Sequence, residues 1–434
     1  MKKFLYSVFM LAAVVLAACS NDDNGDTQPK RGMTLNASVE NLSSRATMTD
    51  ESGTWKFAFA VNDQVIVSNN KISNYYTFTN NGSQFTSTDA MVTTEDANWY
   101  AYFPGNEVDL TNQTGNFADV ANKFAVAGVT AEATTGETGL SITLKSKVAV
   151  LRVVAVDKKG ILDIHVKTAD GKWVKGLTAT KNAADFAVSK SDTKTTLLYK
   201  AAGTVNAGEI NYVVVPAGVK IAIYNGNLLL NTTKDAGLAE GKYYTITSGP
   251  TKGTENALIN GVEKKINWVQ LWAGGPRFAT ENVAEEMTWT EAAKTGSDYV
   301  WGANWRTPTA EEVEEKGGLL FDWNTGQAQA GSPTFTITTA PDGTEETVVF
   351  TGMQLGYTKN TLTLYKKVVN GYNQFDFWTS TNDGGYGCKF IIWRKDNITW
   401  GFGISKRHDP NTEYHLVRPV LSIQNITNIT NNKK

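Results

Sequence analysis

The stretch WGANWRTPTAEE (residues 301–312) places two tryptophans and an arginine directly before a proline and a helix-start signal. Its last four residues, Thr309-Ala-Glu-Glu312, match the Ser/Thr-x-x-Glu capping box, in which the threonine hydroxyl and the glutamate satisfy each other's backbone N–H groups. Upstream, Thr288-Trp-Thr-Glu291 repeats the motif. The two motifs predict two short helices, which Gly296 and Gly317 are positioned to end.

Short strands are predicted on the C-terminal side of these helices. They cover residues 375–379, 389–393, 398–402 and 415–421. Nine of the twelve tryptophans follow residue 250, and residues 248–254 are rich in glycine and other turn formers. The sequence therefore predicts a separate α+β domain beyond a linker, with Trp301, Trp305 and Trp378 in its core.

Residues 33–249 have the pattern of antiparallel β-structure, with short apolar or alternating segments separated by turn residues. The predicted strands cover residues 33–39, 55–61, 64–68, 99–103, 147–156, 209–215, 220–224 and 243–247. Asn81-Gly82 and Asn225-Gly226 favour the positive φ angles of type I′ hairpin turns. We expect two stacked antiparallel β-sandwiches, with a seam in the Gly- and Thr-rich residues 130–139.

The N-terminus carries the pattern of a secretion signal: Lys2 and Lys3, an apolar stretch at residues 4–16, and the small-residue site Leu16-Ala-Ala-Cys19. The apolar stretch is shorter than the roughly 20 residues of a membrane-spanning helix. Leu-Ala-Ala-Cys resembles the lipobox of bacterial lipoproteins, which implies lipidation of Cys19; the alternative is an ordinary signal peptide. Asp22 and Asp23 resemble the surface-export signal of Bacteroidetes lipoproteins, which implies an outer-membrane lipoprotein exposed on the cell surface.

The sequence predicts seven segments in a mainly β chain. They are a signal peptide (1–18), an acidic flexible tether (19–32), a first β-sandwich (33–135), a second β-sandwich (136–249), a linker (250–261), the α+β domain (262–424) and a disordered tail (425–434).

Composition and motifs exclude several classes of function. A formal charge of −2 and a pI near 6.1 argue against a nucleic-acid partner. With Cys19 lipidated, Cys388 is the only thiol left, and we expect it to be buried in the core. His165, His408 and His415 lack metal-ligand spacing, and the last two are predicted to lie at the surface. No nucleophile, phosphate-loop or dinucleotide motif occurs, so we predict neither an enzyme nor a cofactor.

Residues 33–248 resemble the fimbrillin-like lipoproteins of Bacteroidetes, which have two β-sandwiches and are related to subunits of type V pili. The similarity lies in the lipobox, the acidic tether, the first strand, Arg45 in the following loop, and the strand that starts at Lys147. In that family an arginine-directed protease removes the first strand, and the next subunit's strand fills the groove. The resemblance implies cleavage at Arg45 and partner subunits joined by strand exchange; the alternative is an exposed loop arginine.

Residues 262–423 resemble the FISUMP-type domain, a major paralogous domain similar to the C-type-lectin-like fold. The matching motifs are residues 287–293, 304–312, 377–380 and 417–420. The Glu-Pro-Asn loop and the Trp-Asn-Asp strand of calcium-dependent lectins are missing. Thr381-Asn382-Asp383 is only distantly similar to these motifs. We therefore predict no lectin-type metal site.

Aromatic side chains at the surface of this domain are the candidates for ligand binding. Tyr386, Trp393 and Arg394 belong to neighbouring strand segments, where binding and structural roles both remain open. Two functional hypotheses follow. The preferred one is a surface adhesin or pilus tip subunit that binds a glycan or protein through its C-terminal domain. The alternative is a non-polymerising, glycan-binding accessory lipoprotein.

Overall fold

The chain folds mainly as β-structure, as predicted, with three short helices in the residues that the structure describes. The structure is a computed structural model of the 434-residue chain. It describes residues 34–39, 59–71, 74–88, 97–130, 139–157, 160–259, 261–282, 286–294, 301–302, 304–314, 334–339, 345–351, 361–367, 374–394 and 400–421. No helix in these ranges is long and apolar enough to cross a membrane. Cys19 and Arg45 lie outside them, as do the predicted tether and tail.

The first unit is a seven-stranded barrel, closed by parallel pairing of its first and last strands. Its strands are β1 (Thr34–Val39), β2 (Gln64–Asn69), β3 (Tyr76–Asn80), β4 (Phe85–Thr86), β5 (Trp99–Phe103), β7 (Val126–Thr130) and β8 (Gly139–Ser146). Along β8, buried Leu140, Ile142 and Leu144 alternate with exposed residues, so one face of the strand packs on the core. Because β8 pairs with β1 and β7, the first unit extends to Ser146, past the predicted boundary at residue 135.

The second unit is a sandwich of two sheets. The larger sheet contains β6 (Glu107–Asp109), β10 (Leu162–Thr168), β11 (Trp173–Ala179), β12 (Phe186–Ser191), β13 (Leu198–Lys200), β15 (Ile221–Asn225) and β16 (Leu228–Thr232). The smaller sheet contains β9 (Val148–Val154), β14 (Ile210–Pro216) and β17 (Tyr243–Thr247), in the order β14-β9-β17. All the residues of β9 except Arg152 are buried, as the apolar run from Val148 predicted.

The first two units interlock rather than sit end to end. β6 leaves the barrel segment and pairs with β11 of the second unit, where Gly176 lets the backbones approach closely. The Tyr102 hydroxyl donates to the carbonyls of Thr180 (3.0 Å) and Ala183 (2.9 Å). The two-turn helix α1 (Phe117–Lys123) follows β6 and contacts β14. One apolar cluster therefore runs through both units.

The third unit is α+β, with two short helices and several short sheets in its described residues. Its elements are β18 (Lys252–Ile259), β19 (Val262–Gln270), β20 (Arg277–Ala279), β21 (Met287–Thr288), α2 (Trp289–Ala292), β22 (Trp305–Arg306), α3 (Ala310–Glu314), β23 (Thr334–Thr339), β24 (Glu345–Thr351), β25 (Thr361–Lys367), β26 (Gln374–Asp383), β27 (Tyr386–Arg394), β28 (Trp400–His408), β29 (Tyr414–His415) and β30 (Val420–Leu421). The prediction of a linker at 250–261 was wrong. β18 pairs with β19 along its whole length. Exposed polar residues alternate along β18, and this pattern was mistaken for a loop.

Both predicted capping boxes are present. At α2, the Thr288 side chain accepts from the Glu291 N–H, and the Glu291 carboxylate accepts from the Thr288 N–H. At α3, the Thr309 hydroxyl accepts from the Glu312 N–H at 3.1 Å, and the Thr309 N–H donates to the Glu312 carboxylate at 2.9 Å. The predicted strand at 415–421 is instead split into β29 and β30, since Pro419 has no N–H to donate to a ladder.

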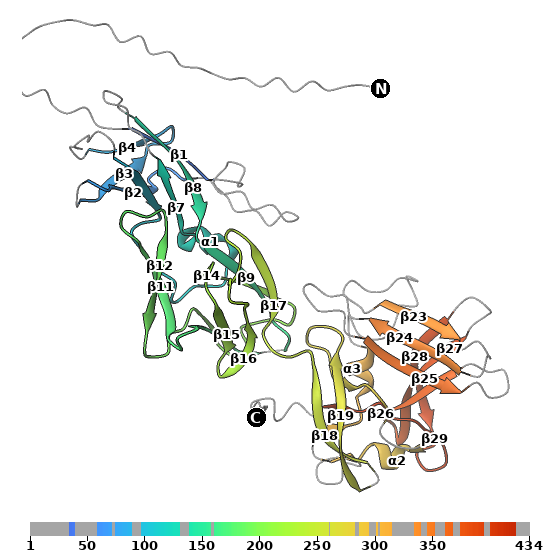
Figure 1. Cartoon of the computed structure of the whole chain (residues 1–434). Helices are drawn as coiled ribbons and strands as arrows, with labels where there is room; N and C mark the ends of the chain where they lie inside the picture. The colour runs from blue at the N-terminus through green and yellow to red at the C-terminus, as the bar shows by residue number, and fades with distance from the viewer. Residues whose placement is uncertain are drawn as a thin grey trace, which may run out of the picture.

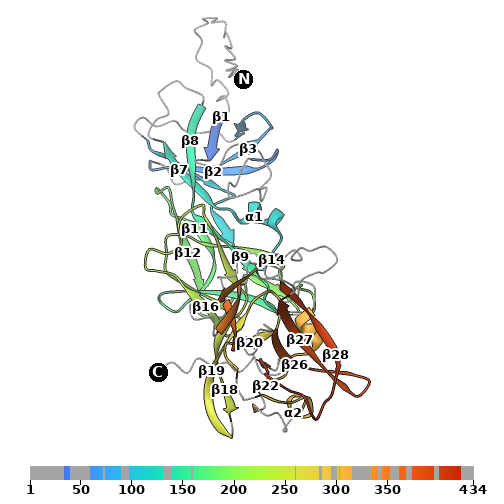
Figure 2. The same cartoon turned by 90° about the vertical axis from the view of Figure 1, so that its right-hand side faces the viewer.

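A hydrogen-bonded joint connects the second and third units. Gln270 Nε2 donates to the carbonyl of Val156 at 3.0 Å, and Arg277 Nη2 lies 2.9 Å from Asp157 Oδ1. The Arg277 guanidinium also stacks over Trp268, with its Cζ 5.4 Å from the ring centroid. Figures 1 and 2 show the barrel at one end of the molecule, the second unit in the middle and the third unit at the other end.

Candidate functional site

The turn between β26 and β27 forms one part of the candidate site. Gly384 and Gly385 have φ angles of 65° and 96°, as the two central positions of a type I′ hairpin turn require. The Asn382 side chain accepts a hydrogen bond from the Gly385 N–H at 2.8 Å, which fixes the turn. Asp383 and Tyr386 therefore stand opposite each other at the two strand ends.

A β-bulge on the neighbouring strand brings a third side chain to this turn. Gly387 pairs with His408, but Lys389 pairs with Ser405, so β28 contains one extra residue here. Arg407 absorbs the irregularity with a φ of 65°. The other described non-glycine residues with positive φ are asparagines, which tolerate this region far better than arginine. The bulge thus holds Arg407 in an unfavourable conformation beside the turn.

Asp383, Gly384, Tyr386 and Arg407 line a pocket of about 370 Å³. Tyr386 is 47% exposed, so one part of its ring is open to solvent. Arg407 Nε lies 3.7 Å from Asp383 Oδ2, which holds a guanidinium and a carboxylate side by side at the rim. The volume lies at the lower end of the range for small-ligand sites. An aromatic ring, a cation and an anion are the groups that a hydroxyl-rich or charged ligand can use.

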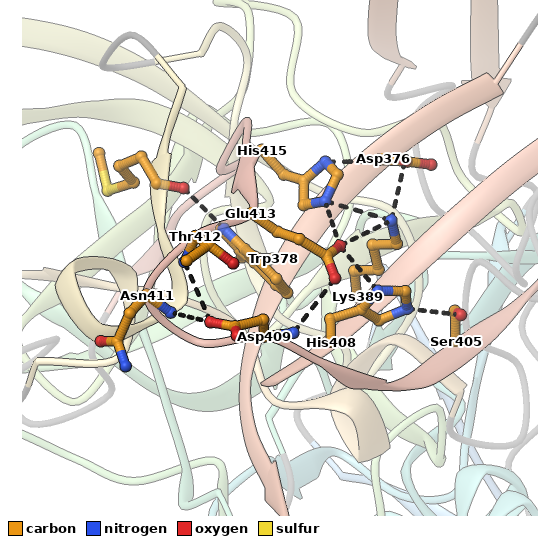
Figure 3. Close-up of polar contacts among 11 residues, drawn as sticks. Asp376, Trp378, Lys389, Ser405, His408, Asp409, Asn411, Thr412, Glu413 and His415 are labelled. Atoms are coloured by element: carbon orange, nitrogen blue, oxygen red, sulfur yellow. Dashed lines mark hydrogen bonds and ion pairs between the residues drawn. The ribbon is translucent and has the colours of Figure 1, made fainter. Parts of the chain in front are cut away.

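Next to the pocket, polar side chains from β26, β27, β28 and β29 come together in a cluster (Figure 3). We call Asp376, Lys389, His408, Glu413 and His415 the Lys389 cluster. Lys389 is 6% exposed, and its Nζ lies 3.1 Å from Asp376 Oδ2, 3.1 Å from His415 Nε2 and 3.7 Å from Glu413 Oε2. The buried ammonium is thus compensated by two carboxylates, as a buried charge requires.

The Lys389 contact fixes the protonation of His415. An ammonium group can only donate, so His415 Nε2 accepts from Lys389 and the ring proton sits on Nδ1, 3.6 Å from Asp376 Oδ2. Burial, together with the charge of Lys389, lowers the pKa of His415 below its ordinary 6.5, although Glu413 and Asp376 oppose the shift. His415 is therefore neutral in the folded protein at neutral pH.

Glu413 connects the cluster to a surface loop. Burial raises its pKa, but hydrogen bonds from the Asp409 N–H and His408 outweigh burial and hold the pKa of Glu413 at about 2. His408 Nδ1 donates to Glu413 Oε2 at 2.8 Å, and its Nε2 faces the Ser405 hydroxyl at 2.6 Å. The ionised carboxylate thus ties β28 and β29 to the loop that begins at Asp409.

The loop is also fastened to helix α2. Asp409 Oδ1 accepts from the N–H groups of Asn411 (2.9 Å) and Thr412 (3.1 Å). Thr290, in α2, donates its N–H and its hydroxyl to the Pro410 carbonyl, both at 3.0 Å. The loop after β28 is therefore fastened both to the Lys389 cluster, through Glu413, and to helix α2.

Tryptophans form the core behind this support, as predicted. Trp301, Trp305 and Trp378 are at most 1% exposed. Trp305 Nε1 donates to the Asn256 carbonyl at 2.9 Å, and Trp378 Nε1 to the Met287 carbonyl at 2.7 Å. The indole rings of Trp305 and Trp378 therefore satisfy their polar N–H groups while they fill the space between the helices and the sheet, whereas the buried Trp301 Nε1 has no hydrogen-bond partner among the described residues.

The structure separates the three predicted ligand-binding residues. Tyr386 lines the pocket at the start of β27, whereas Trp393 and Arg394 lie at its end, and their side chains are outside the described part. Trp393 follows Tyr386 by seven positions, which at about 3.3 Å per residue is roughly 23 Å along the strand. One small ligand cannot reach both.

Other predictions for this unit divide into one confirmed and one wrong. Cys388 is buried at 1% exposure in β27, as predicted. The histidines predicted at the surface are not there: the side chains of His408 and His415 are 18% and 17% exposed, because both turn inward to the Lys389 cluster. Within the described residues, no group of three His, Cys, Asp or Glu side chains is arranged to hold a metal ion.

The pocket residues other than Tyr386 had only weak signals in the sequence. Asp383 belongs to Thr381-Asn382-Asp383, and Arg407 to the charged segment before His408. Gly384-Gly385 after an alternating strand is a hairpin signal that could have placed Asp383 opposite Tyr386. The bulge that presents Arg407 has no counterpart in the sequence pattern.

No protein-family model matches the sequence, and no curated protein matches it significantly. Among solved structures, the chain is similar to a candidate cell adhesion protein from Bacteroides uniformis, with 12% identity and a TM-score of 0.30 over 50% of this chain and 93% of that one. It is also similar to a fimbrial protein from Bacteroides ovatus, with 12% identity and a TM-score of 0.26 over 91% and 99%. A candidate adhesin from Bacteroides thetaiotaomicron has 9% identity and a TM-score of 0.25 over 46% and 79%. These values are too low to transfer the role of any of these proteins to this chain.

Proposed function

We propose that the chain is a cell-surface lipoprotein that acts as an adhesin or pilus tip subunit and binds its ligand through the third unit. The observation that carries the proposal is the pocket at the β26–β27 turn. Arg407 keeps a backbone conformation there that costs on the order of 1–3 kcal/mol, and such strain clusters at binding sites. The strain has a use if it aims the guanidinium at a ligand beside Tyr386.

The chemistry of the pocket suits a saccharide. The open face of the Tyr386 ring can pack on the C–H face of a sugar, and the Asp383 carboxylate can accept from its hydroxyls. Arg407 presents several N–H donors in one plane, and its side chain is 79% exposed. A sugar ring would therefore find a stacking surface, a hydrogen-bond acceptor and a planar set of hydrogen-bond donors in one pocket.

The arrangement of the three units supports presentation of this pocket away from the cell. Cys19 precedes β1 in the sequence, and β1 belongs to the barrel, which lies at the end of the molecule opposite the third unit (Figures 1 and 2). The pairing of β6 with β11 and the Arg277–Asp157 contact connect the barrel to the third unit through the second unit. These features agree with the resemblance to fimbrillin-like lipoproteins that carry a FISUMP-type, C-type-lectin-like domain.

Replacement of Tyr386 tests the binding proposal. The full mature chain and its Tyr386→Ala variant would be applied to an array of neutral and acidic glycans and to immobilised mucin. Tyr414→Ala is the matched control, because Tyr414 is also an exposed tyrosine of the third unit, at 56%, but does not line the pocket. We expect Tyr386→Ala to weaken binding by about tenfold or more. Equal binding by all three proteins would overturn the proposal.

A second candidate function is a non-polymerising, glycan-binding accessory lipoprotein. The observation in its favour is that β1 is fully incorporated in the barrel. Six residues of β1 pair with β8, from Thr34↔Gly139 to Val39↔Leu144, and Leu35 is completely buried. A chain that keeps this strand has no groove for a partner's strand.

N-terminal sequencing and native mass of the protein from its own cells distinguish the two candidates. A new N-terminus at Ala46 in a high-mass assembly would support cleavage at Arg45 and strand exchange. A lipidated Cys19 on a monomer would reject the pilus role and leave the accessory role, without affecting the Tyr386 test.

A further inference from the structure

A second group of aromatic and charged side chains lies far from the pocket, on the outer face of the larger sheet of the second unit. Residues of β10 alternate between the core and this face: Ile164 and Val166 are buried in the core, whereas Lys167 emerges on the other side. Lys167 pairs with Trp173 of β11, and His165 pairs with Tyr224 of β15. Strand register thus collects these side chains on one surface.

The rings and the ammonium groups are in direct contact. Lys167 Nζ lies 4.3 Å from the centroid of the Trp173 ring and 5.9 Å from that of Tyr224. A second ammonium, Lys194 Nζ, lies 6.0 Å from the Trp173 centroid. Trp173 and Tyr224 meet edge to face at 5.8 Å. We call Lys167, Trp173, Lys194 and Tyr224 the lysine–aromatic patch.

The patch is held in place from below. Buried His165 packs edge to face on Trp173 at 5.7 Å, and its Nδ1 donates to the Thr195 carbonyl at 2.6 Å. The Thr195 hydroxyl donates to the Val174 carbonyl at 2.6 Å. Lys194, the preceding residue, donates from Nζ to the Gly226 carbonyl at 3.0 Å. The segment that carries Lys194 is therefore fastened across the sheet.

Neither lysine of the patch has a carboxylate partner among the described residues, although nearby lysines do. On the same part of the sheet, Lys172 Nζ lies 3.3 Å from Asp192 Oδ1, and Lys190 Nζ lies 2.8 Å from Asp170 Oδ2. Asp163, next to the patch, lies 2.9 Å from His165 Nε2. The local carboxylates are thus engaged elsewhere, and two ammonium groups share one indole ring.

We propose that the lysine–aromatic patch binds an acidic polysaccharide, with a carboxylate or sulfate group between Lys167 and Lys194 and a sugar ring against Tyr224 or Trp173. Charge complementarity selects an anion, since two ammonium groups that both lie within 6.0 Å of the Trp173 ring centroid repel each other until an anion compensates them. The half-buried aromatic faces select a ligand that also has an apolar face, as a sugar ring has. This site lies in a different unit from the Tyr386 pocket and does not depend on the function proposed for it.

The test measures binding of the full mature chain to immobilised heparin, polygalacturonate and neutral dextran. The Lys167→Gln/Lys194→Gln variant removes the two charges of the patch. The Lys172→Gln/Lys190→Gln variant is the matched control, because it removes the same net charge from neighbouring lysines that are already paired. We expect the patch variant to bind the acidic polysaccharides about tenfold or more weakly, and the control to change by less than about twofold.

Salt and competing surfaces sharpen this test. Binding to the patch should weaken steeply between about 0.1 and 1 M salt, as the screening length falls from about 10 to 3 Å. No binding to either acidic polysaccharide, equal losses in both double variants, or binding only to phosphatidylglycerol vesicles would each overturn the proposal. Failure here is distinguishable from failure of the pocket, because the Lys167→Gln/Lys194→Gln variant leaves Asp383, Tyr386 and Arg407 intact.

Discussion

The first two units bury mostly valine, leucine and alanine, whereas the third unit buries tryptophan. One apolar cluster extends from Leu35 in β1 to Leu238 near the end of the second unit. The third unit has its own cluster, in which Trp268, Trp301, Trp305 and Trp378 are the largest members. Many aliphatic side chains make up the first cluster, whereas a few tryptophans fill much of the second.

The two regions also differ in how polar groups take part. The interlock of the first two units relies on backbone pairing between β6 and β11. The third unit adds a buried ammonium with two carboxylates and two histidines, and the indole N–H groups of Trp305 and Trp378 donate to backbone carbonyls. The first two units are therefore stabilised together by strand pairing that crosses from one unit to the other, whereas the third unit depends on contacts of particular side chains.

Trp305→Ala should have the largest effect and should be confined to the third unit. Trp305 is completely buried and donates to the Asn256 carbonyl, so its loss leaves a cavity and a carbonyl without its donor. We expect the free energy of unfolding of this unit to fall by about 3–5 kcal/mol. Calorimetry of the full chain should show the transition of the third unit shifted down and the other transition nearly unchanged.

Leu151→Ala is the reciprocal variant, because Leu151 is completely buried in β9 of the shared cluster. It should lower the stability of the first two units together by about 2–5 kcal/mol. If either variant shifted both transitions equally, the two regions would be one cooperative unit and the comparison would be wrong.

Gly176→Ala should have the next largest effect, on the interlock of the first two units. A Cβ at Gly176 would lie 2.3 Å from the Val108 carbonyl oxygen of β6, and a backbone atom cannot move aside cheaply. We expect a loss of about 1–3 kcal/mol, typical of overpacking, with faster proteolysis near β6. Gly105→Ala in the same segment is the control, since its nearest atom, the Glu107 carbonyl oxygen, is 3.8 Å away. Equal stability of both variants would contradict the interlock.

Local signals in the sequence predicted much of the third unit. Two capping boxes and the alternating strands around Trp378 depend on residues close together in the chain, and the structure contains all of them. Burial of Trp301 and Trp305 also followed from their position beside a helix start. Such features need only local geometry, so a single sequence contains enough information for them.

Features that depend on distant pairing were missed. The assignment of β8 to the barrel rests on its register with β1, about a hundred residues upstream, and β6 pairs across the unit boundary with β11. The strand β18 was taken for a linker, since its glycine and polar residues resemble a loop until β19 is placed beside it.

The candidate site was predicted only in part for the same reason. Tyr386 was proposed from its strand position, but Asp383 and Arg407 join it through a turn and a bulge. The lysine–aromatic patch combines residues from three strands and a loop, so no local motif could indicate it.

Mild acid should destabilise the third unit through His415, and this is the smallest effect that we expect. The pKa of His415 is lower in the folded chain than its ordinary 6.5, so the unfolded chain binds the additional proton more readily. Stability is therefore complete above about pH 6.5 and is lost as the pH falls through the folded pKa of His415. The groups that face His415 are Lys389, Asp376 and Glu413, and protonation brings a second cation against the Lys389 ammonium.

His415→Gln isolates this effect, because glutamine can still accept from Lys389 but does not titrate. The melting temperature of the third unit should fall between pH 7.5 and 5.5 in the wild type and much less in the variant. Glu413, with a pKa of about 2 in the folded chain and 4.5 ordinarily, should cause a further loss below about pH 4.5 in both proteins. A wild type whose third unit is equally stable at pH 7.5 and 5.5 would mean that His415 binds a proton as readily in the folded chain as in the unfolded chain, which would contradict the prediction.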